Sequence, residues 1–127
     1  MADKEYPMGS IPVNAGSGNI ANNTAAATMS ADAARFNYLS GFDITFAGAT
    51  VGLAVIAILT GIAGGPLSYI ISAPAGATVG GAAMSMRFPQ PLRSTAINTA
   101  ITLSVPALGL GNTNIAVNLY GYSYVNG

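Results

Sequence analysis

A long run without charge, broken at short intervals by glycine and proline, is the feature that most restricts the fold of this chain. No charged residue lies within residues 44–86, which is long enough for a membrane helix of roughly 20 apolar residues. However, Gly64-Gly65-Pro66 and Pro74-Ala75-Gly76 are turn signals. The longest segment without such breakers, residues 53–60, has the length of a strand. We therefore predict a β-strand over about residues 52–60 in preference to a small membrane protein centred on this run.

Both faces of this predicted strand are apolar. Side chains alternate between the two faces of a strand, so Val55 and Leu59 point one way while Ile56 and Ile58 point the other. One face would meet the domain core, and the second face requires a cover of its own. A packed second layer, the N-terminal segment or a neighbouring subunit would supply that cover. We predict that Ile56 and Ile58 are interface residues, buried like Val55 and Leu59.

Most of the remaining chain shows the two-residue period of strands. Apolar residues alternate with polar ones in five runs, at 38–46, 67–72, 84–88, 97–105 and 115–120. Segments rich in Gly, Pro and Asn separate the strands, at 47–50, 61–66, 73–81, 89–94 and 106–114. Short strands with such turns indicate an all-β sandwich or barrel. We predict a single-domain antiparallel β-sandwich over residues 24–127, with seven or eight strands in two sheets.

Two N-terminal segments, residues 1–23 and residues 24–34, do not show this two-residue period. Residues 1–23 are small, polar and rich in Gly and Asn, without any period, and are predicted to form an extended N-terminal arm held by an assembly. Residues 24–34 fit either a short strand or a helical turn.

Charged residues make up only 6% of the chain, against roughly 25% in an ordinary soluble domain. Four positive and four negative charges cancel, so the chain has no basic footprint for nucleic acid. A free monomer with so little charge would tend to self-associate. The low charge fits either a domain made soluble by Asn, Ser and Thr or a subunit largely covered by neighbours, and we favour the subunit.

The residue types that carry most catalytic and metal chemistry are scarce. Cys and His are absent, which excludes disulfides, thiolate nucleophiles, imidazole bases and zinc sites with sulfur or nitrogen ligands. The only carboxylates are Asp3, Glu5, Asp32 and Asp43, and Lys4 is the only lysine. We therefore predict a protein that is not an enzyme and that has no catalytic residues, no metal site and no cofactor.

Two arginines, Arg87 and Arg93, flank the segment Phe-Pro-Gln-Pro-Leu, which its prolines hold extended. These arginines either cap solvent-facing turns or bond to carboxylates or carbonyls of a neighbouring subunit. Asp32 and Asp43 are the plausible acidic partners, because few other acidic residues exist.

Three tyrosines, Tyr120, Tyr122 and Tyr124, share one face of the last predicted strand. They fit a sheet surface packed beneath the arm, or an aromatic strip at an interface, where tyrosine is enriched. A carbohydrate-stacking platform is a third interpretation.

Two long segments, SGNIANNTAAATMSADAARFNYLSGFDITFAGAT and FPQPLRSTAINTAITLSVPALGLGNTNIAVNLYGY, resemble small virion structural proteins of tailed bacteriophages. The resemblance covers roughly residues 16–122 and rests on strand and turn patterning. It implies a jelly-roll-like sandwich on a phage particle, often as a homotrimer, with the virion head surface as its location. The implied role is a capsid decoration or cement subunit whose partners are the major capsid protein or other virion subunits. Tail or baseplate placement, and a lectin-like or receptor-contacting binding module, remain alternatives.

Overall fold

Strands account for all the regular structure that the computed structural model describes, namely residues 7–48, 53–73 and 81–126. They are β1 (Ile11–Gly16), β2 (Ala25–Met29), β3 (Phe36–Ala47), β4 (Leu53–Thr60), β5 (Leu67–Ala73), β6 (Gly81–Arg93), β7 (Ile101–Val105) and β8 (Asn114–Tyr124). β4 confirms the strand predicted from the breaker-free segment. Within these ranges no helix is long and apolar enough to cross a membrane.

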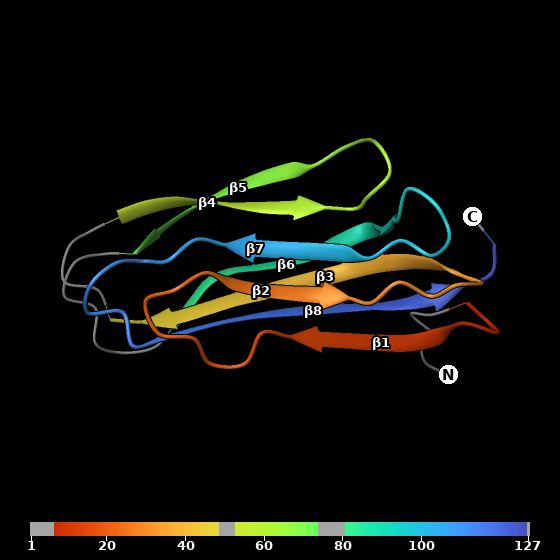
Figure 1. Ribbon diagram of the computed structural model, residues 1–127. Helices are drawn as coiled ribbons and strands as arrows, with labels where there is room; N and C mark the ends of the chain where they lie inside the picture. Colours follow the sequence, from red (N-terminus) through yellow and green to blue (C-terminus); the bar gives the residue numbers. More distant parts are fainter. Residues whose placement is uncertain (1–6, 49–52, 74–80, 127) are drawn as a thin grey trace.

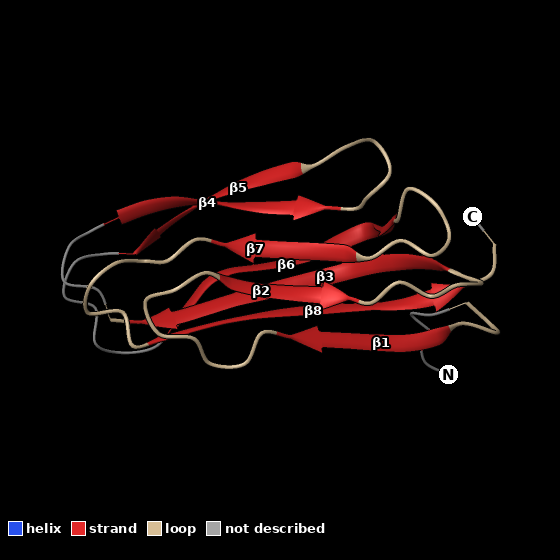
Figure 2. Cartoon of the chain, viewed as in Figure 1, coloured by secondary structure: helices blue, strands red, loops and turns tan. Residues whose placement is uncertain are grey.

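The strands form two four-stranded antiparallel sheets that face each other (Figures 1 and 2). Sheet A has the order β1-β8-β3-β6, and sheet B has the order β2-β7-β4-β5. The first strand therefore pairs with the last, the second with the seventh, the third with the sixth and the fourth with the fifth. A long hairpin rolled up on itself produces this order, which is that of an eight-stranded jelly roll. The prediction of an all-β, jelly-roll-like antiparallel sandwich is confirmed.

The core lies between the sheets and is built from the inward positions of the alternating strands. β7 and β8 show the pattern most clearly, because buried apolar residues alternate with half-exposed polar or small ones over most of their length. Burying each large apolar side chain contributes about 1.5–3 kcal/mol, most of which the ordering of the chain offsets. The largest fully buried side chains are Phe42, Met29, Leu39, Ile44, Leu59, Ile101, Leu103, Leu108, Ile115, Leu119, Val105 and Val117.

The N-terminal segment departs from its prediction as an arm outside the sandwich. β1 pairs with β8 along its whole length and forms an edge of sheet A. Val13 and Ala15 pack against the core from this edge, and Ile20 bridges to Ile115 farther along β8. The alternation of Ile11, Val13 and Ala15 was hidden by the Gly and Asn residues around it. Residues 1–6 of the predicted arm lie outside the described residues.

A β-bulge in β3 interrupts the alternation predicted over residues 38–46 and changes the face on which Tyr38 lies. The ladder of β3 skips from Leu39 to Gly41 against both β6 and β8. This extra residue reverses the alternation, so Tyr38 faces outward, although strict alternation placed it with Phe42. A Cβ on Gly41 would lie 2.4 Å from the carbonyl oxygen of Met86, so the bulge requires glycine there.

The predicted turn at 89–94 is also wrong, because β6 continues through it to Arg93. Arg87 pairs with Gly41 and Leu92 with Leu39, so residues 88–91 of β6 are opposite Ser40 alone. The prolines in this segment cannot donate to a ladder, and the gap in pairing accommodates them. The predicted run at 97–105 is strand only from Ile101 onward. Residues 49–52 and 74–80, within or beside two other predicted turns, lie outside the described residues.

Candidate interaction surfaces

The outer face of sheet B exposes isoleucines that the sequence predicted to need a cover. Ile56 and Ile58 on β4 are 51% and 42% exposed, whereas Val55 and Leu59 are 8% and 0% exposed. Ile70 of β5 is 71% exposed and lies directly opposite Ile56 in the ladder between β4 and β5. We call the outward side chains of Ile56, Ile58 and Ile70 the apolar face. The inward half of the prediction for β4 is thus confirmed, and its outward half is open in the single chain.

Hydroxyl side chains surround the apolar face. They come from the neighbouring outward positions of all four strands: Thr28, Thr60, Ser68, Ser72, Thr102 and Ser104. The hydroxyls of Thr28 and Thr102 are 3.0 Å apart and bond to each other. Among the described residues, no charged side chain occupies an outward position of this sheet. Contacts here would therefore depend on shape, apolar burial and hydrogen bonding.

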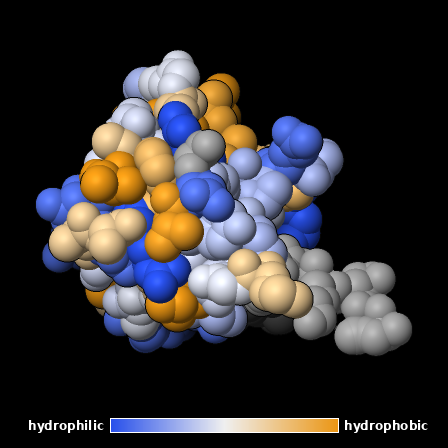
Figure 3. All heavy atoms as spheres, turned by 90° about the vertical axis from the view of Figure 1, so that its right-hand side faces the viewer, coloured by the Kyte–Doolittle hydropathy of each residue, from blue (hydrophilic) through white to orange (hydrophobic). Residues whose placement is uncertain are grey.

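The end of the sandwich differs from this face. Figure 3 looks onto the end at which β4 leads into β5, and there hydrophobic residues are interspersed with hydrophilic ones. Isolated exposed apolar residues of this kind are normal on a protein surface. On the outer face of sheet B, by comparison, Ile56 and Ile70 are paired neighbours on adjacent strands, and we take this face as the candidate interaction surface.

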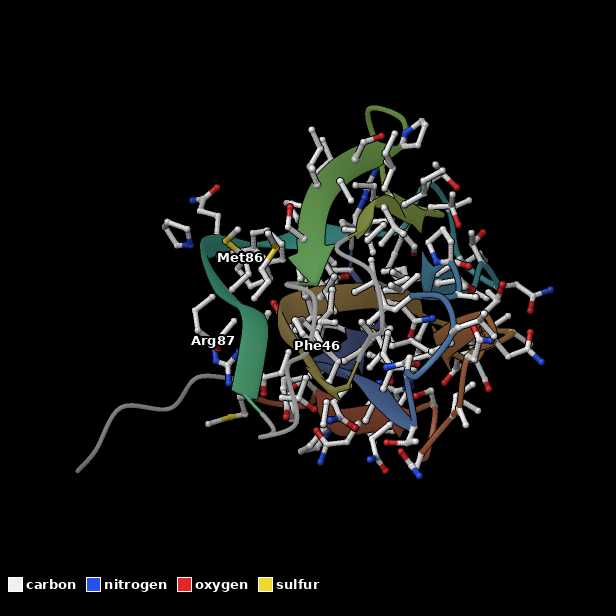
Figure 4. The ribbon with its side chains drawn as sticks, turned by 90° about the vertical axis from the view of Figure 1, so that its left-hand side faces the viewer. Phe46, Met86 and Arg87 are labelled. Carbon is white, nitrogen blue, oxygen red and sulfur yellow. The ribbon has the colours of Figure 1, made fainter. Side chains whose placement is uncertain are left out.

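A polar cluster occupies the outer face of sheet A and contains two of the predicted site residues. Asp43 accepts hydrogen bonds from the hydroxyls of Tyr120, at 2.6 Å, and Ser85, at 2.7 Å. Arg87 forms an ion pair with Asp43 at 3.4 Å, and its guanidinium carbon lies 4.8 Å from the centre of the Tyr120 ring. Figure 4 shows the side chain of Arg87 in the end view, beside Met86 on the same strand. Arg87 therefore bonds to Asp43, one of the two predicted carboxylates, but within its own chain.

These hydrogen bonds fix the charge state of the cluster. The bond from Tyr120 lowers the pKa of Asp43 most, and the bond from Ser85 and the nearby Arg87 lower it further against the opposing effect of burial. The same bond raises the pKa of the Tyr120 phenol. At neutral pH the cluster thus holds an ionised carboxylate and a neutral phenol, with donors of the same chain on both carboxylate oxygens.

Within the described part of the chain, Arg93 makes no ion pair with Asp32 or Asp43. Its Nε donates to the carbonyl oxygen of Ser94 at 3.2 Å, and its guanidinium carbon lies 4.7 Å from the centre of the Phe36 ring. The second predicted carboxylate, Asp32, pairs instead with Arg35 at 3.8 Å. Arg93 ends β6, so the structure places it on a strand and not in the predicted turn.

The three predicted tyrosines do share the outer face of β8, but not as an open strip. Tyr122 is only 5% exposed and its ring stacks on Tyr38, with centroids 4.9 Å apart. Burial raises the pKa of the Tyr122 phenol. Tyr120 is engaged with Asp43, and Tyr124 is half-buried. A carbohydrate platform needs exposed ring faces, and this geometry gives it no support.

Two buried asparagines, which the sequence did not single out as structural, hold the loops at opposite ends of β3. Asn37 is 1% exposed, and its Nδ2 donates to the carbonyl oxygens of Ser30 and Thr99, each at 2.9 Å. Asn112 is 2% exposed, and its Nδ2 donates to the carbonyl oxygens of Ala47 at 3.1 Å and Asn114 at 2.9 Å. Asn112 lies in the predicted turn at 106–114, and the structure uses its side chain internally.

Comparison of the chain with protein-family models, with curated proteins and with solved structures found no match. The described residues also contain no group of three or more Asp or Glu side chains placed to hold a metal ion. The outer face of sheet B and the cluster around Asp43 are therefore interpreted from their own geometry.

Proposed function

We propose that this protein is a non-enzymatic structural subunit of a virus particle, a decoration subunit that binds and stabilises a phage head shell. The observation that carries the proposal is the apolar face, where Ile56, Ile58 and Ile70 are exposed without any nearby charge on that sheet. A jelly roll that has already buried a complete core has no need of these side chains for its own fold. The sequence resemblance to phage virion proteins supplies the location.

The physical basis of binding would be apolar burial against shell subunits and other copies of the chain. Each square ångström of apolar surface removed from water contributes about 25 cal/mol. One such contact is weak, but a shell contains many copies of it, and their summed binding free energy would resist expansion of the shell. The two described carboxylates, Asp32 and Asp43, are already paired with arginines of the same chain, so an ionic contact with the shell is not their role in this proposal.

A direct test adds the purified chain to phage heads that lack their decoration subunit and measures occupancy by cryo-EM or co-sedimentation. We expect binding that persists at high salt, because apolar contacts are not screened as ion pairs are. The double variant Ile56→Ser/Ile58→Ser should lose most of this binding.

The matched control is Ala26→Ser, which adds one hydroxyl to an exposed position on the same sheet. It should bind as the unmodified chain does. Heads that stay undecorated at every salt concentration, or a double variant that binds as well as the control, would contradict the proposal.

A further inference from the structure

One edge strand, β5, lacks the features that normally keep sheet edges from pairing with other chains. A free edge exposes unpaired backbone N–H and C=O groups, and proteins protect such edges with proline, charge, bulges or short strands. The other three edges are protected in this way: β1 contains Pro12, β6 contains two prolines and a bulge, and β2 has only five residues. β5 has seven residues, with no proline, no charge and no register shift against β4.

β5 ends the strand order of sheet B, and among the described residues it pairs with β4 alone. Figure 1 shows it along the upper edge of the molecule. Its central outward residue, Ile70, is the most exposed of the three apolar-face isoleucines at 71%.

We propose that β5 pairs antiparallel with β5 of a second copy, so that two four-stranded sheets become one continuous sheet across a twofold axis at Ile70. The inference rests on the proposed function and deepens it by naming the contact between copies. The occupant is a second copy because both edges are uncharged, so two of them meet without the repulsion between like charges that opposes self-pairing.

The register of this pairing follows from the alternation of side chains. Residues opposite each other in a ladder must point to the same face, so the twofold axis must pass through a residue and not between two residues. Only an axis at Ile70 pairs all seven positions. It places Ile70 opposite Ile70, Ser68 opposite Ser72, and Tyr69 opposite Ile71.

This register continues features that each copy already has. Ile56 and Ile70 lie side by side in one copy, so the axis creates a row of four isoleucines across both copies. The Ser68 and Ser72 hydroxyls are placed to bond across strands. Seven paired residues supply about six to eight backbone hydrogen bonds, which is within the range of a typical protein interface.

The pairing is isologous and predicts a dimer, whereas a trimer requires two different surfaces in contact. The sequence resemblance implies trimers, so the mass of the purified chain distinguishes the two arrangements. We expect a dimer by analytical ultracentrifugation at micromolar concentration. A trimer, or a monomer at all concentrations, would overturn the inference.

Disulfide cross-linking tests the register, and the chain has no cysteine to interfere. Opposed residues in an antiparallel ladder have Cα atoms about 4.5–5.5 Å apart, which is within the range that a disulfide bridges. Ile70→Cys should therefore form a covalent dimer under mild oxidation. Ser68→Cys is the matched control, because two copies of residue 68 would be about 14 Å apart. The double variant Ser68→Cys/Ser72→Cys should cross-link again.

Equal cross-linking of Ser68→Cys and Ile70→Cys would show random collision and would overturn the inference. Ile70→Lys provides an independent test, because it places two like charges at the twofold axis. The side chain of Ile70 is 71% exposed in the single chain, so the fold of that chain should tolerate the lysine. Its circular dichroism should match that of the unmodified chain, and its dimer should be lost. A dimer that survives this change would also overturn the pairing. If the chain binds to phage heads but Ile70→Cys does not cross-link, the pairing alone is rejected. If Ile70→Cys cross-links but the chain does not bind to heads, the proposed function alone is rejected.

Discussion

At the scale of single residues, buried polar groups decide how the loops are held. The side-chain amide of Asn37 donates hydrogen bonds to the carbonyl oxygens of Ser30, just after β2, and Thr99, just before β7. The backbone N–H of Asn37 donates to the hydroxyl of Ser94, and its carbonyl oxygen accepts from the backbone N–H of Ser94. An amide in such a position stabilises only when all its partners are present. One of the two interpretations of the low charge made Asn a solubilising surface residue, whereas Asn37 and Asn112 are buried.

The cluster around Asp43 makes stability depend on pH in a defined direction. Its hydrogen bonds lower the pKa of Asp43 in the folded state below its ordinary value of 3.8, so the unfolded chain binds the proton more readily. The contribution of this carboxylate is therefore complete above pH 3.8 and is lost as the pH falls through the lowered folded pKa. We expect Asp43→Asn to lower the free energy of unfolding at neutral pH by about 1–2 kcal/mol.

Urea unfolding of both proteins over a range of pH checks this expectation. The difference between them should be constant at neutral pH and should shrink below pH 3.8. Tyr120→Phe, which removes the main cause of the lowered pKa, should flatten the dependence in the same range. A difference that grows on acidification would show that the sign is wrong.

A second residue-scale prediction concerns Gly41 in the β3 bulge. A methyl group there would meet the backbone oxygen of Met86, which is held in the ladder with β3 and cannot move aside. We expect Gly41→Ala to cost about 1–3 kcal/mol of stability by overpacking. Gly16→Ala is the control, since its nearest contact is the flexible side chain of Asn118. Thermal unfolding that ranks the two equally would contradict this account.

The same bulge explains where prediction from the sequence failed for single residues. Alternation correctly placed Phe42 and Ile44 inward and Asp43 outward, because one-sided burial selects for a period of two. It misplaced Tyr38, because one extra residue in a ladder leaves no mark in the local pattern. The partners Arg87 and Asp43 were found from the scarcity of charge, but whether they belong to one chain or two depends on the register of β3 against β6.

At the scale of elements, β1 belongs to the sandwich and should contribute to its stability. Its removal would expose the edge of β8 and the core beneath Val13 and Ala15. We expect deletion of residues 1–16 to lower the urea midpoint and to promote aggregation through the uncovered edge. Deletion of residues 1–6 is the control, because it leaves β1 and its ladder with β8 in place, and its midpoint should lie above that of the longer deletion. Equal midpoints for the two truncations would mean that β1 is not a working strand of the sheet.

Element prediction from the sequence succeeded for strands with large residues on one face and failed where small or special residues form the strand. β4 was found because a segment of strand length contains no Gly or Pro, and β8 because apolar and polar residues alternate in it. β1 was missed because its inward residues, Val13 and Ala15, are few and small. The predicted length of β6 was too short, because proline is typical both of turns and of strand positions without a ladder partner. Only the pairing with the neighbouring strand shows which of the two a given proline occupies.

At the scale of the whole molecule, the distribution of charge separates two kinds of surface. Sheet A carries the ionic cluster around Asp43, while the outer face of sheet B carries hydroxyls and isoleucines. The sequence predicted a cover for Ile56 and Ile58 from the two-faced apolarity of β4, and this cover stays a prediction. It missed Ile70, because the serines on either side of it on the same face, Ser68 and Ser72, indicated a polar, solvent-facing side.

If β5 joins two copies, the stability of the fold must depend on protein concentration. A partner that binds only the folded chain shifts the unfolding equilibrium by mass action. For a dimer that unfolds to two separate chains, each tenfold rise in concentration should add about 0.7 kcal/mol per chain to the apparent free energy of unfolding. The midpoint of thermal unfolding should rise accordingly, as measured by circular dichroism over a dilution series.

Ile70→Lys separates this effect from any other consequence of dilution. Its side chain lies at the proposed axis and is 71% exposed, so the variant should keep the fold of the single chain while losing the partner. Its melting midpoint should then be the same at every concentration and should match the unmodified chain at the lowest one. A midpoint independent of concentration in both proteins would mean that β5 does not pair with a second copy in solution. The apolar face would then have to find its partner on the shell alone.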